Sequence, residues 1–313
     1  MSYLKDREDA WIKEQIKLDK VREKEIIKQL QHAIDSIQTE IDANWDRFSN
    51  GQQITISEAR KRAAKMDVER FQRKAKEYVE NKDFSPQANK ELKIYNLVMR
   101  VSRLELLKAQ IGLELVTLFD GLDKWGYSQL SSGAKEEYLR QAGILGSTLD
   151  ENYTKKVSSI VNASFKSREY ASFSDNIWQN FTEMKADLEK LLTKAITQGK
   201  NPRTVASELA KFLKPNQENI RYKLNRLMIT EMTAIQTDIQ KQSYLDAEIE
   251  DYDYIAEPSA CEICKKVAIG SPYKVVKMVK GVNAPFMHPF CKCSTAPHVD
   301  RDSFEKTLKK RGL

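Results

Sequence analysis

The residues most able to do chemistry in this 313-residue chain are cysteines gathered near its C-terminus. Cys261 and Cys264 stand two residues apart, and the run His-Pro-Phe-Cys-Lys-Cys follows after 23 intervening residues. A Cys-x-x-Cys pair places two thiolates on one tight loop, and ligands from a distant hairpin can complete a tetrahedral zinc site. The candidate ligands are therefore Cys261, Cys264, His288, Cys291 and Cys293.

Five candidates compete for the four places of a tetrahedral site. The single residue between Cys291 and Cys293 makes it difficult for both sulfurs to bind one metal ion. The two residues between His288 and Cys291 allow both of these side chains to bind it more easily. We therefore rank Cys261, Cys264 and Cys291 first, with His288 or Cys293 in the fourth place. Two disulfides, or free buried thiols, are the alternatives. A filled site has no position for water, so we expect structural Zn²⁺ that supplies folding energy to a small module, and no catalytic residue.

The elements that position these ligands are expected to be mostly helical. The chain is 41% apolar and 31% charged, with only 8 prolines and 11 glycines. So few turn-forming residues argue against the many short strands of a β-sandwich or β-barrel. We predict a mainly α fold of long amphipathic helices, with a small C-terminal zinc-stabilised α+β module.

Apolar residues recur at helical spacing in several stretches of the N-terminal half. The pattern predicts helices over residues 27–48, about 55–79 and 94–118. His32 falls on a polar face of the first. Five of the eleven glycines lie between residues 120 and 146, which predicts an irregular, hinge-like segment with a domain boundary nearby.

Helical spacing continues in the second half. It predicts a helix from about 177 to 198, a short helix from 202 that Pro215 ends, and a longer one over 219–244. The segments DYDYIAEP and YKVVKMV, on either side of the first cysteine pair, predict two short strands. Three successive domains follow: a helical region 1–145, a second helical part 146–244, and a Cys/His zinc-binding module with a basic tail, 245–313.

Charge is segregated along the chain, although its net value is only +7. Residues 190–226 contain nine basic and two acidic side chains, residues 265–292 contain six lysines and no acid, and residues 246–257 contain six acids and no base. This segregation suits non-specific contact of basic helices with DNA phosphates. Solvated helix faces are the alternative interpretation.

The N-terminus and the hydropathy predict an intracellular chain. Charges begin at Lys5, which argues against a secretory signal, and the densest apolar run, Ile111–Phe119, is too short to span a membrane. We therefore expect a protein of the cytoplasm that does not associate with membranes.

The segment from Glu257 to Pro297 resembles the signature of the phage head morphogenesis family, the minor head proteins of tailed phages exemplified by the F protein of Mu. The family form is Cys-x-x-Cys with a nearby glycine, then His-Pro-x-Cys-Arg-Cys, and here Lys292 replaces the usual arginine. Upstream, Arg226-Leu-Met-Ile-Thr-Glu231 is similar to a family helix that ends in Thr-Glu, and residues 196–199 resemble its preceding turn. The likeness covers about residues 187–299.

The resemblance implies a minor capsid protein that is present in few copies in the virion and in the host cytoplasm during assembly. It implies association with the portal vertex, with the portal protein and other head proteins as partners, and a role in head morphogenesis, DNA packaging or ejection. It does not imply an enzyme.

Two alternatives stay open at this point. One is a non-specific DNA-binding protein that is delivered with the genome. The other is a zinc-supported nuclease in which His288 or His298 activates water; we otherwise expect His298 to be a surface residue. Glu231 lies on the apolar side of its helix, where we expect it to cap or brace the zinc module rather than to serve as a catalytic carboxylate.

Overall fold

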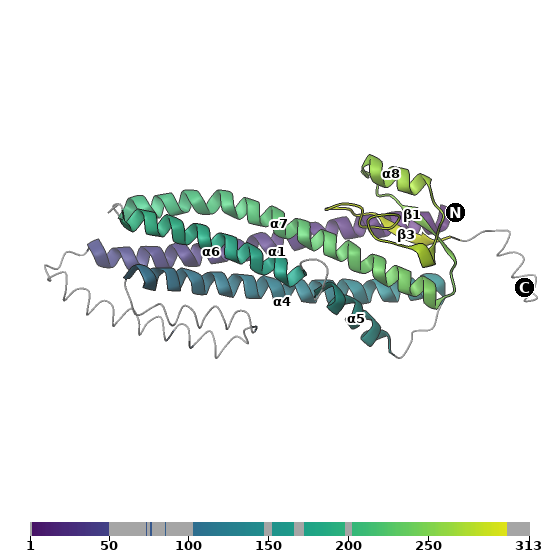
Figure 1. The fold of residues 1–313 in the computed structure, drawn as a ribbon, viewed down its shortest axis with the longest axis horizontal. Helices are drawn as coiled ribbons and strands as arrows, with labels where there is room; N and C mark the ends of the chain where they lie inside the picture. The colour runs from purple at the N-terminus through teal and green to yellow at the C-terminus, as the bar shows by residue number, and fades with distance from the viewer. Residues whose placement is uncertain are drawn as a thin grey trace, which may run out of the picture. The chain divides into compact units, whose positions relative to one another are not determined.

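The computed structural model describes residues 2–49, 73, 76, 85, 103–146, 152–165, 172–197 and 202–298. These residues are mainly helical and end in a small sheet, which confirms the predicted fold class (Figure 1). The elements are α1 (Ser2–Ser49), α4 (Arg103–Leu145), α5 (Tyr153–Phe165), α6 (Phe173–Thr197), α7 (Pro202–Asp246), β1 (Asp251–Ile255), α8 (Glu262–Ile269), β2 (Tyr273–Lys274), the 3₁₀ turn η1 (Val275–Lys277) and β3 (Ser294–Pro297). Apart from isolated positions, the helix predicted over 55–79 lies outside the described residues.

The contacts divide the chain into two compact units. The module-bearing unit combines Met1–Lys24, Trp125–Ser174 and Lys223–Leu313, and the all-helical unit combines Glu25–Lys124 and Asp175–Tyr222. Each unit is assembled from segments that are distant in the sequence, whereas the predicted domains 1–145, 146–244 and 245–313 follow the chain in order. Within the described residues, no helix combines the length and the apolarity that a membrane span needs.

Helix α1 begins far earlier than the predicted residue 27. Its buried face includes Ile12, Ile26, Leu30 and Ile37, and separations of 14, 4 and 7 residues place these side chains on one side of the helix. His32 is exposed, as its place on the polar face predicts.

The glycine-rich stretch is helical, so the prediction of an irregular hinge over residues 120–146 is wrong. Helix α4 runs through it to Leu145. A Cβ atom at Gly126 would overlap the ring of Phe173, and one at Gly133 would overlap the thioether of Met232. These two glycines therefore allow close packing of neighbouring helices, which offsets their helix propensity cost of about 1 kcal/mol each. Only Gly146, with φ +61°, acts as a helix terminator.

Helix α7 is also longer than predicted. It begins at Pro202, as the Asn-Pro start signal indicates, but it continues through Pro215 to Asp246, so the predicted break is wrong. Interior proline costs a helix about 3 kcal/mol. The buried residues Leu224, Met228 and Ile235 farther along α7 belong to a long apolar face, whose packing stabilises a helix more than propensity alone.

The C-terminal sheet has the strand order β2-β1-β3, with both neighbours antiparallel to β1. Strand β1 coincides with the predicted DYDYI strand. Of the predicted YKVVKMV strand only Tyr273–Lys274 pairs with β1, because the chain turns into η1 at Val275. Strand β3 was not predicted, since STAP lacks an alternating pattern, yet all four of its residues are buried.

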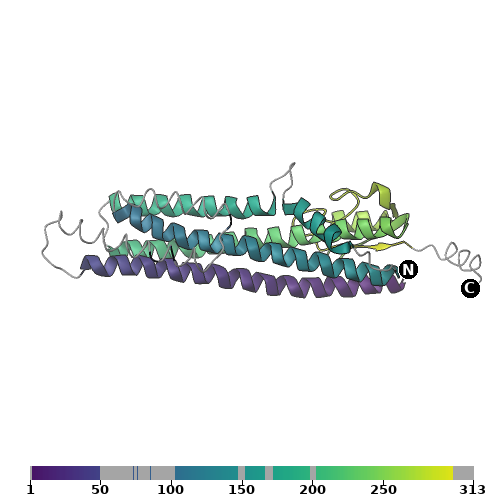
Figure 2. The same cartoon turned by 90° about the horizontal axis from the view of Figure 1, so that it is seen from below.

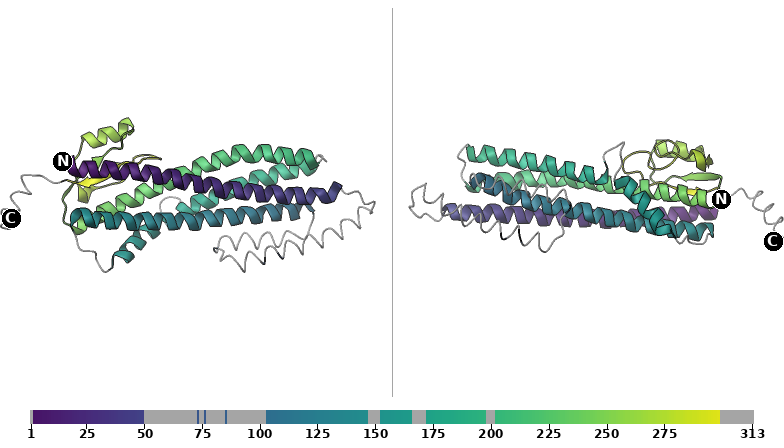
Figure 3. Two further views of the ribbon diagram at one scale, coloured as in Figure 1. Left: turned by 180° about the vertical axis from the view of Figure 1, so that it is seen from behind. Right: turned by 60° about the horizontal axis from the view of Figure 1, so that its bottom comes forward.

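The sheet lies beside the N-terminal end of α1, and this part of α1 lies beside the C-terminal part of α4 (Figures 2 and 3). An apolar cluster of Ile12, Ile255 and Ala296 joins α1 to the sheet. The same unit contains a second cluster around Tyr244 and Tyr252. The C-terminal module is therefore packed into the unit that carries it and is not an appendage.

A buried polar network reinforces this packing. Arg140 of α4 donates to both carboxylate oxygens of Glu8 at 2.5 and 3.1 Å, and to those of Glu137 at 2.8 Å. Ser294 of β3 donates to Glu8 at 2.8 Å, and Gln240 of α7 donates to Glu137 at 2.9 Å. Burial raises the pKa of Glu8, and Arg140 opposes that shift. Four elements are thus joined through two buried carboxylates.

Candidate metal centre

Cys261 occupies the N-cap position of α8, with extended backbone geometry. The backbone N–H groups of Cys264 and Ile263 donate to its sulfur and lower the pKa of the Cys261 thiol. The short Cys-Glu-Ile-Cys loop therefore wraps around the first sulfur and favours its thiolate. It also carries Cys264 to the inner side of α8, where that side chain is only 1% exposed.

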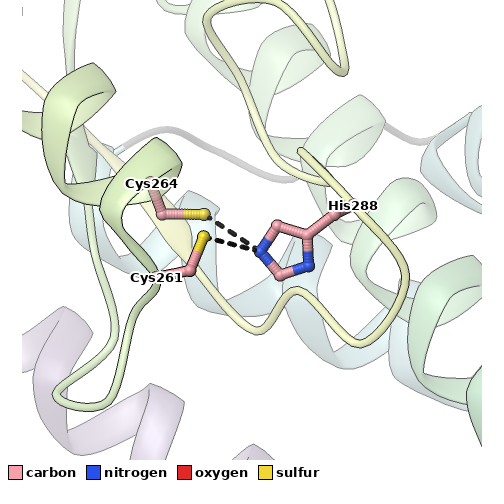
Figure 4. Close-up of side chains that lie close together, drawn as sticks. All are labelled: Cys261, Cys264 and His288. Carbon is pink, nitrogen blue, oxygen red and sulfur yellow. Dashed lines mark hydrogen bonds between the residues drawn. The ribbon is translucent and has the colours of Figure 1, made fainter.

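The imidazole of His288 faces both of these sulfurs (Figure 4). Its Nε2 lies 3.2 Å from Cys261 Sγ and 3.4 Å from Cys264 Sγ. On the other side of the ring, Nδ1 lies 2.8 Å from the carbonyl oxygen of Pro289. Because a carbonyl only accepts, Nδ1 carries the proton and Nε2 presents its lone pair, the arrangement in which histidine ligates a metal.

The sulfur of Cys291 also lies near that of Cys264, with 3.9 Å between the two sulfurs. The Cys293 thiol, together with the backbone N–H groups of Met287 and Cys293, holds the pKa of Cys291 at about 5 despite burial. The sulfurs of Cys264, Cys291 and Cys293 form a second close group, with all separations within 4.8 Å. Cys264 is the residue that the two groups share.

Three of these separations are near the edges of a tetrahedral metal site, whereas Cys291 does not lie within 4.8 Å of both Cys261 and His288. With Zn–S near 2.3 Å and Zn–N near 2.0 Å, the edges of a tetrahedron are about 3.8 Å between sulfurs and about 3.6 Å between sulfur and nitrogen. The observed edges are 3.9, 3.2 and 3.4 Å. All four cysteines are free thiols, and the two disulfides considered above are not formed. The five predicted residues thus come together in a cluster that can hold a metal ion.

Tyr254 is a member of this centre that the sequence analysis missed. It is buried, and its hydroxyl lies 3.8 Å from Cys291 Sγ. Burial raises the pKa of Tyr254 far above its ordinary value, so the hydroxyl keeps its proton and can donate to a thiolate. The alternation in DYDYI was the available signal, since it places Tyr252 and Tyr254 on one buried face of β1.

The loop that carries His288 and Cys291 is held by two threonines of α7. Thr233 is buried and donates to the carbonyl oxygen of Cys291 at 2.8 Å, and the backbone N–H of Phe290 donates to Thr230 at 3.4 Å. Phe290 has a φ of +63°, a conformation that such contacts help to hold. These bonds attach the metal loop to the long helix.

The two other residues singled out from the sequence lie elsewhere. Glu231, between the threonines, accepts a hydrogen bond of 2.6 Å from Ser164 of α5, so the bracing expected of it falls to Thr230 and Thr233. Nδ1 of His298 lies 2.9 Å from Asp253 Oδ2, and the residue is partly buried rather than on the open surface. Neither belongs to the metal-binding groups found among the described residues.

Much of the positive charge around the centre is neutralised locally. Four of the six lysines between residues 265 and 292 form ion pairs within the chain. Their carboxylate partners are Glu262 for Lys265, Glu250 and Asp251 for Lys274, Asp238 for Lys280 and Asp19 for Lys292. The module is therefore a weaker attractor for phosphate than its sequence suggests.

Comparison with known proteins agrees with the motif. Residues 186–296 match the family described as Phage Mu protein F like protein. This match begins in α6 and includes α7, the sheet and all five metal-ligand candidates. It confirms the resemblance to the phage head morphogenesis family. No curated protein and no solved structure matches the chain.

Proposed function

We propose that this chain, whose residues 186–296 carry the phage Mu protein F like domain, is a structural protein of the phage head. The family match supports a role in head morphogenesis and partners among the other head proteins. Our finer proposal is a minor component at the portal vertex that acts in head assembly, or in packaging or ejection of the DNA. The observation that carries it is the domain match together with the assembled Cys/His centre.

We further propose that the centre binds one structural Zn²⁺. Cys261, Cys264, His288 and Cys291 are the proposed ligands, because Nε2 of His288 faces the first two sulfurs and Cys291 Sγ lies 3.9 Å from the shared Cys264 Sγ. Cys293 then serves as a partner of the Cys291 thiolate. When bound, the ion crosslinks α8 to the 288–293 loop and supplies folding energy to a module with few large apolar residues.

No catalytic function is proposed. A site filled by four protein ligands leaves no position for a reacting water. Thr230 and Thr233 hold the loop through backbone groups, an arrangement that suits rigidity. The nuclease alternative requires His288 or His298 to activate water, but His288 faces two sulfurs and His298 lies outside the groups of possible metal ligands among the described residues.

Purified virions and heads test the proposed function. The protein should be present there in few copies, and crosslinking should join it to the portal protein. A phage with an amber codon in this gene should yield fewer infectious particles, and a wild-type copy supplied in trans should restore them. Absence of the protein from heads at every stage of assembly would refute the proposal.

Non-specific DNA binding is a second candidate, favoured by exposed basic side chains between residues 190 and 226. Lys190, Lys211 and Arg226 are all exposed. Phosphate contacts release counterions, so binding through them should weaken steeply with salt. Gel retardation of plasmid DNA at 50 and 200 mM salt, with divalent metal present to reveal cleavage, distinguishes binding from nuclease action.

A further inference from the structure

The segment from Val275 to Ala284, here called the valine loop, exposes an unusual amount of apolar surface. Val276, Val279 and Val282 are 75%, 52% and 65% exposed. They recur every third residue within this one short loop. Clustered exposed apolar side chains on a folded surface mark interaction sites more often than isolated ones do.

The inner side of the same loop is firmly packed. Val275, Met278 and Ala284 are buried and form one cluster with Tyr244 and Tyr252. The loop therefore uses one set of apolar residues for the core of its own unit and holds another set outward. The exposed valines are therefore not core residues left exposed by incomplete packing of the loop.

Hydrogen bonds hold the valine loop in this shape. The Asn283 side chain accepts from the backbone N–H of Val279 at 2.8 Å and donates to the carbonyl oxygen of Lys277 at 2.9 Å. Lys241 of α7 donates to the carbonyl oxygen of Met278 at 2.8 Å. Gly281 makes the turn with a φ of +78°. A loop held in this way loses little conformational entropy when it binds a partner.

The charge beside the valines is positive. Lys277 is exposed and, within the described part of the chain, its ammonium makes no hydrogen bond or ion pair, whereas Lys280 is paired with Asp238. No acidic residue occurs between residues 263 and 292. A complementary surface would therefore be apolar at its centre and would carry carboxylates at its edge.

We propose that the valine loop is a docking surface for another protein of the phage head, one that offers an apolar groove rimmed by carboxylates. This inference rests on the proposed function. Protein is favoured over DNA because valine side chains gain nothing from phosphates, and because four of the six nearby lysines are already paired. The mode of contact is a rigid apolar ridge inserted into a groove, with Lys277 adding specificity.

The test uses the full-length chain and the purified portal and major capsid proteins encoded with it, measured by biolayer interferometry. The variant Val276→Ser/Val279→Ser/Val282→Ser should weaken binding to one of these proteins at least about tenfold, the loss expected for truncation of an interface centre. Lys277→Glu should weaken the same interaction by a smaller factor that shrinks in high salt. Ile269→Ser, which changes an exposed apolar residue of α8 in the same module, is the matched control and should bind like wild type.

Each outcome of this experiment supports or overturns the proposed docking surface. Circular dichroism and metal content must match wild type for all variants; if the valine variant alone fails to fold, photocrosslinking from position 282 replaces it and should label the bound head protein. Equal binding by wild type and the valine variant overturns the inference while leaving the proposed function intact. Loss of self-association, or of DNA binding, in the valine variant also overturns it, in favour of a second copy or of DNA. If wild type binds neither head protein and is absent from heads, the proposed function fails as well.

Discussion

At the scale of single residues, Cys264 is the centre of the Cys/His cluster. It is buried, and it is the member that the two close groups of donors share. Cys293, in contrast, belongs to only one of them. The two residues are of the same type, but their positions in the Cys/His cluster predict different effects of substitution.

Cys264→Ser should lower bound zinc from about one ion per chain to less than about a tenth of that, because it removes a shared ligand. The C-terminal module should loosen while the helices stay folded. Elemental analysis and hydrogen exchange measure the two effects. Cys293→Ser is the matched control and should retain the metal. Equal metal loss in both variants would show that the ligand set proposed here is wrong.

Tyr254→Phe should weaken zinc binding by about 10- to 100-fold, the usual range for removal of a hydrogen bond to a metal ligand. The reason is loss of the donor that lies 3.8 Å from Cys291 Sγ. Competition with a chromophoric chelator gives the affinity. Tyr252→Phe makes a good comparison, because its hydroxyl donates to the carbonyl oxygen of Asn283 instead. Similar affinities for the two variants would contradict the role of Tyr254.

At the scale of elements, the helices α4 and α7 are longer than local signals allow. Gly126 and Gly133 stand where neighbouring helices leave no room for a Cβ atom. Gly143, in the same helix, has no neighbouring atom within 4 Å of an added Cβ. The glycines of α4 therefore have different structural roles although their residue type is the same.

Gly126→Ala should destabilise the protein by about 1–3 kcal/mol, because the added methyl overpacks against Phe173. Gly143→Ala should instead stabilise it by up to about 1 kcal/mol through helix propensity. Urea unfolding followed by circular dichroism measures both free energies of unfolding. If the two substitutions had the same sign, close packing would not be the reason for the glycine at position 126.

At the scale of the whole molecule, the module-bearing unit depends on a buried ionic network. Arg140 neutralises Glu8 of α1 and Glu137 of its own helix, and Ser294 and Gln240 complete their hydrogen bonds. This network connects the first residues of the chain to its last strand. The first part of α1 therefore belongs to the unit that carries the Cys/His cluster.

Arg140→Met should lower the free energy of unfolding by about 3–5 kcal/mol, because it leaves two carboxylates buried without a counter-charge. Adding Glu8→Gln should restore part of the loss, since one of those charges is removed. Thermal unfolding of the single and double variants provides the comparison. Lys265→Met, which removes an exposed pair with Glu262, should change stability by less than about 1 kcal/mol. A loss at Arg140 no greater than this would rule out the network as a stabilising element.

The sequence alone determined the mainly helical class, the position of β1 and the members of the Cys/His cluster. Helix class follows from apolar spacing along the chain, and Cys261 and Cys264 meet because two intervening residues form one tight loop. His288 and Cys291 are also near each other in the sequence, and they were added because a tetrahedral site needs further ligands. Each pair is recognised from residues that are near one another, whereas the approach of one pair to the other is a tertiary contact.

Only the tertiary structure decided the remaining features. Helix α7 continues through Pro215, and α4 continues through Gly126 and Gly133. The reason is that packing against helices distant in the sequence outweighs local helix propensity. The tertiary structure also placed Tyr254 at the thiolates, and Ser294 in a buried strand within hydrogen-bonding distance of Glu8. Such partners are separated by tens to hundreds of residues, so no local pattern records their contact. These contacts form only when folding buries the polar groups together.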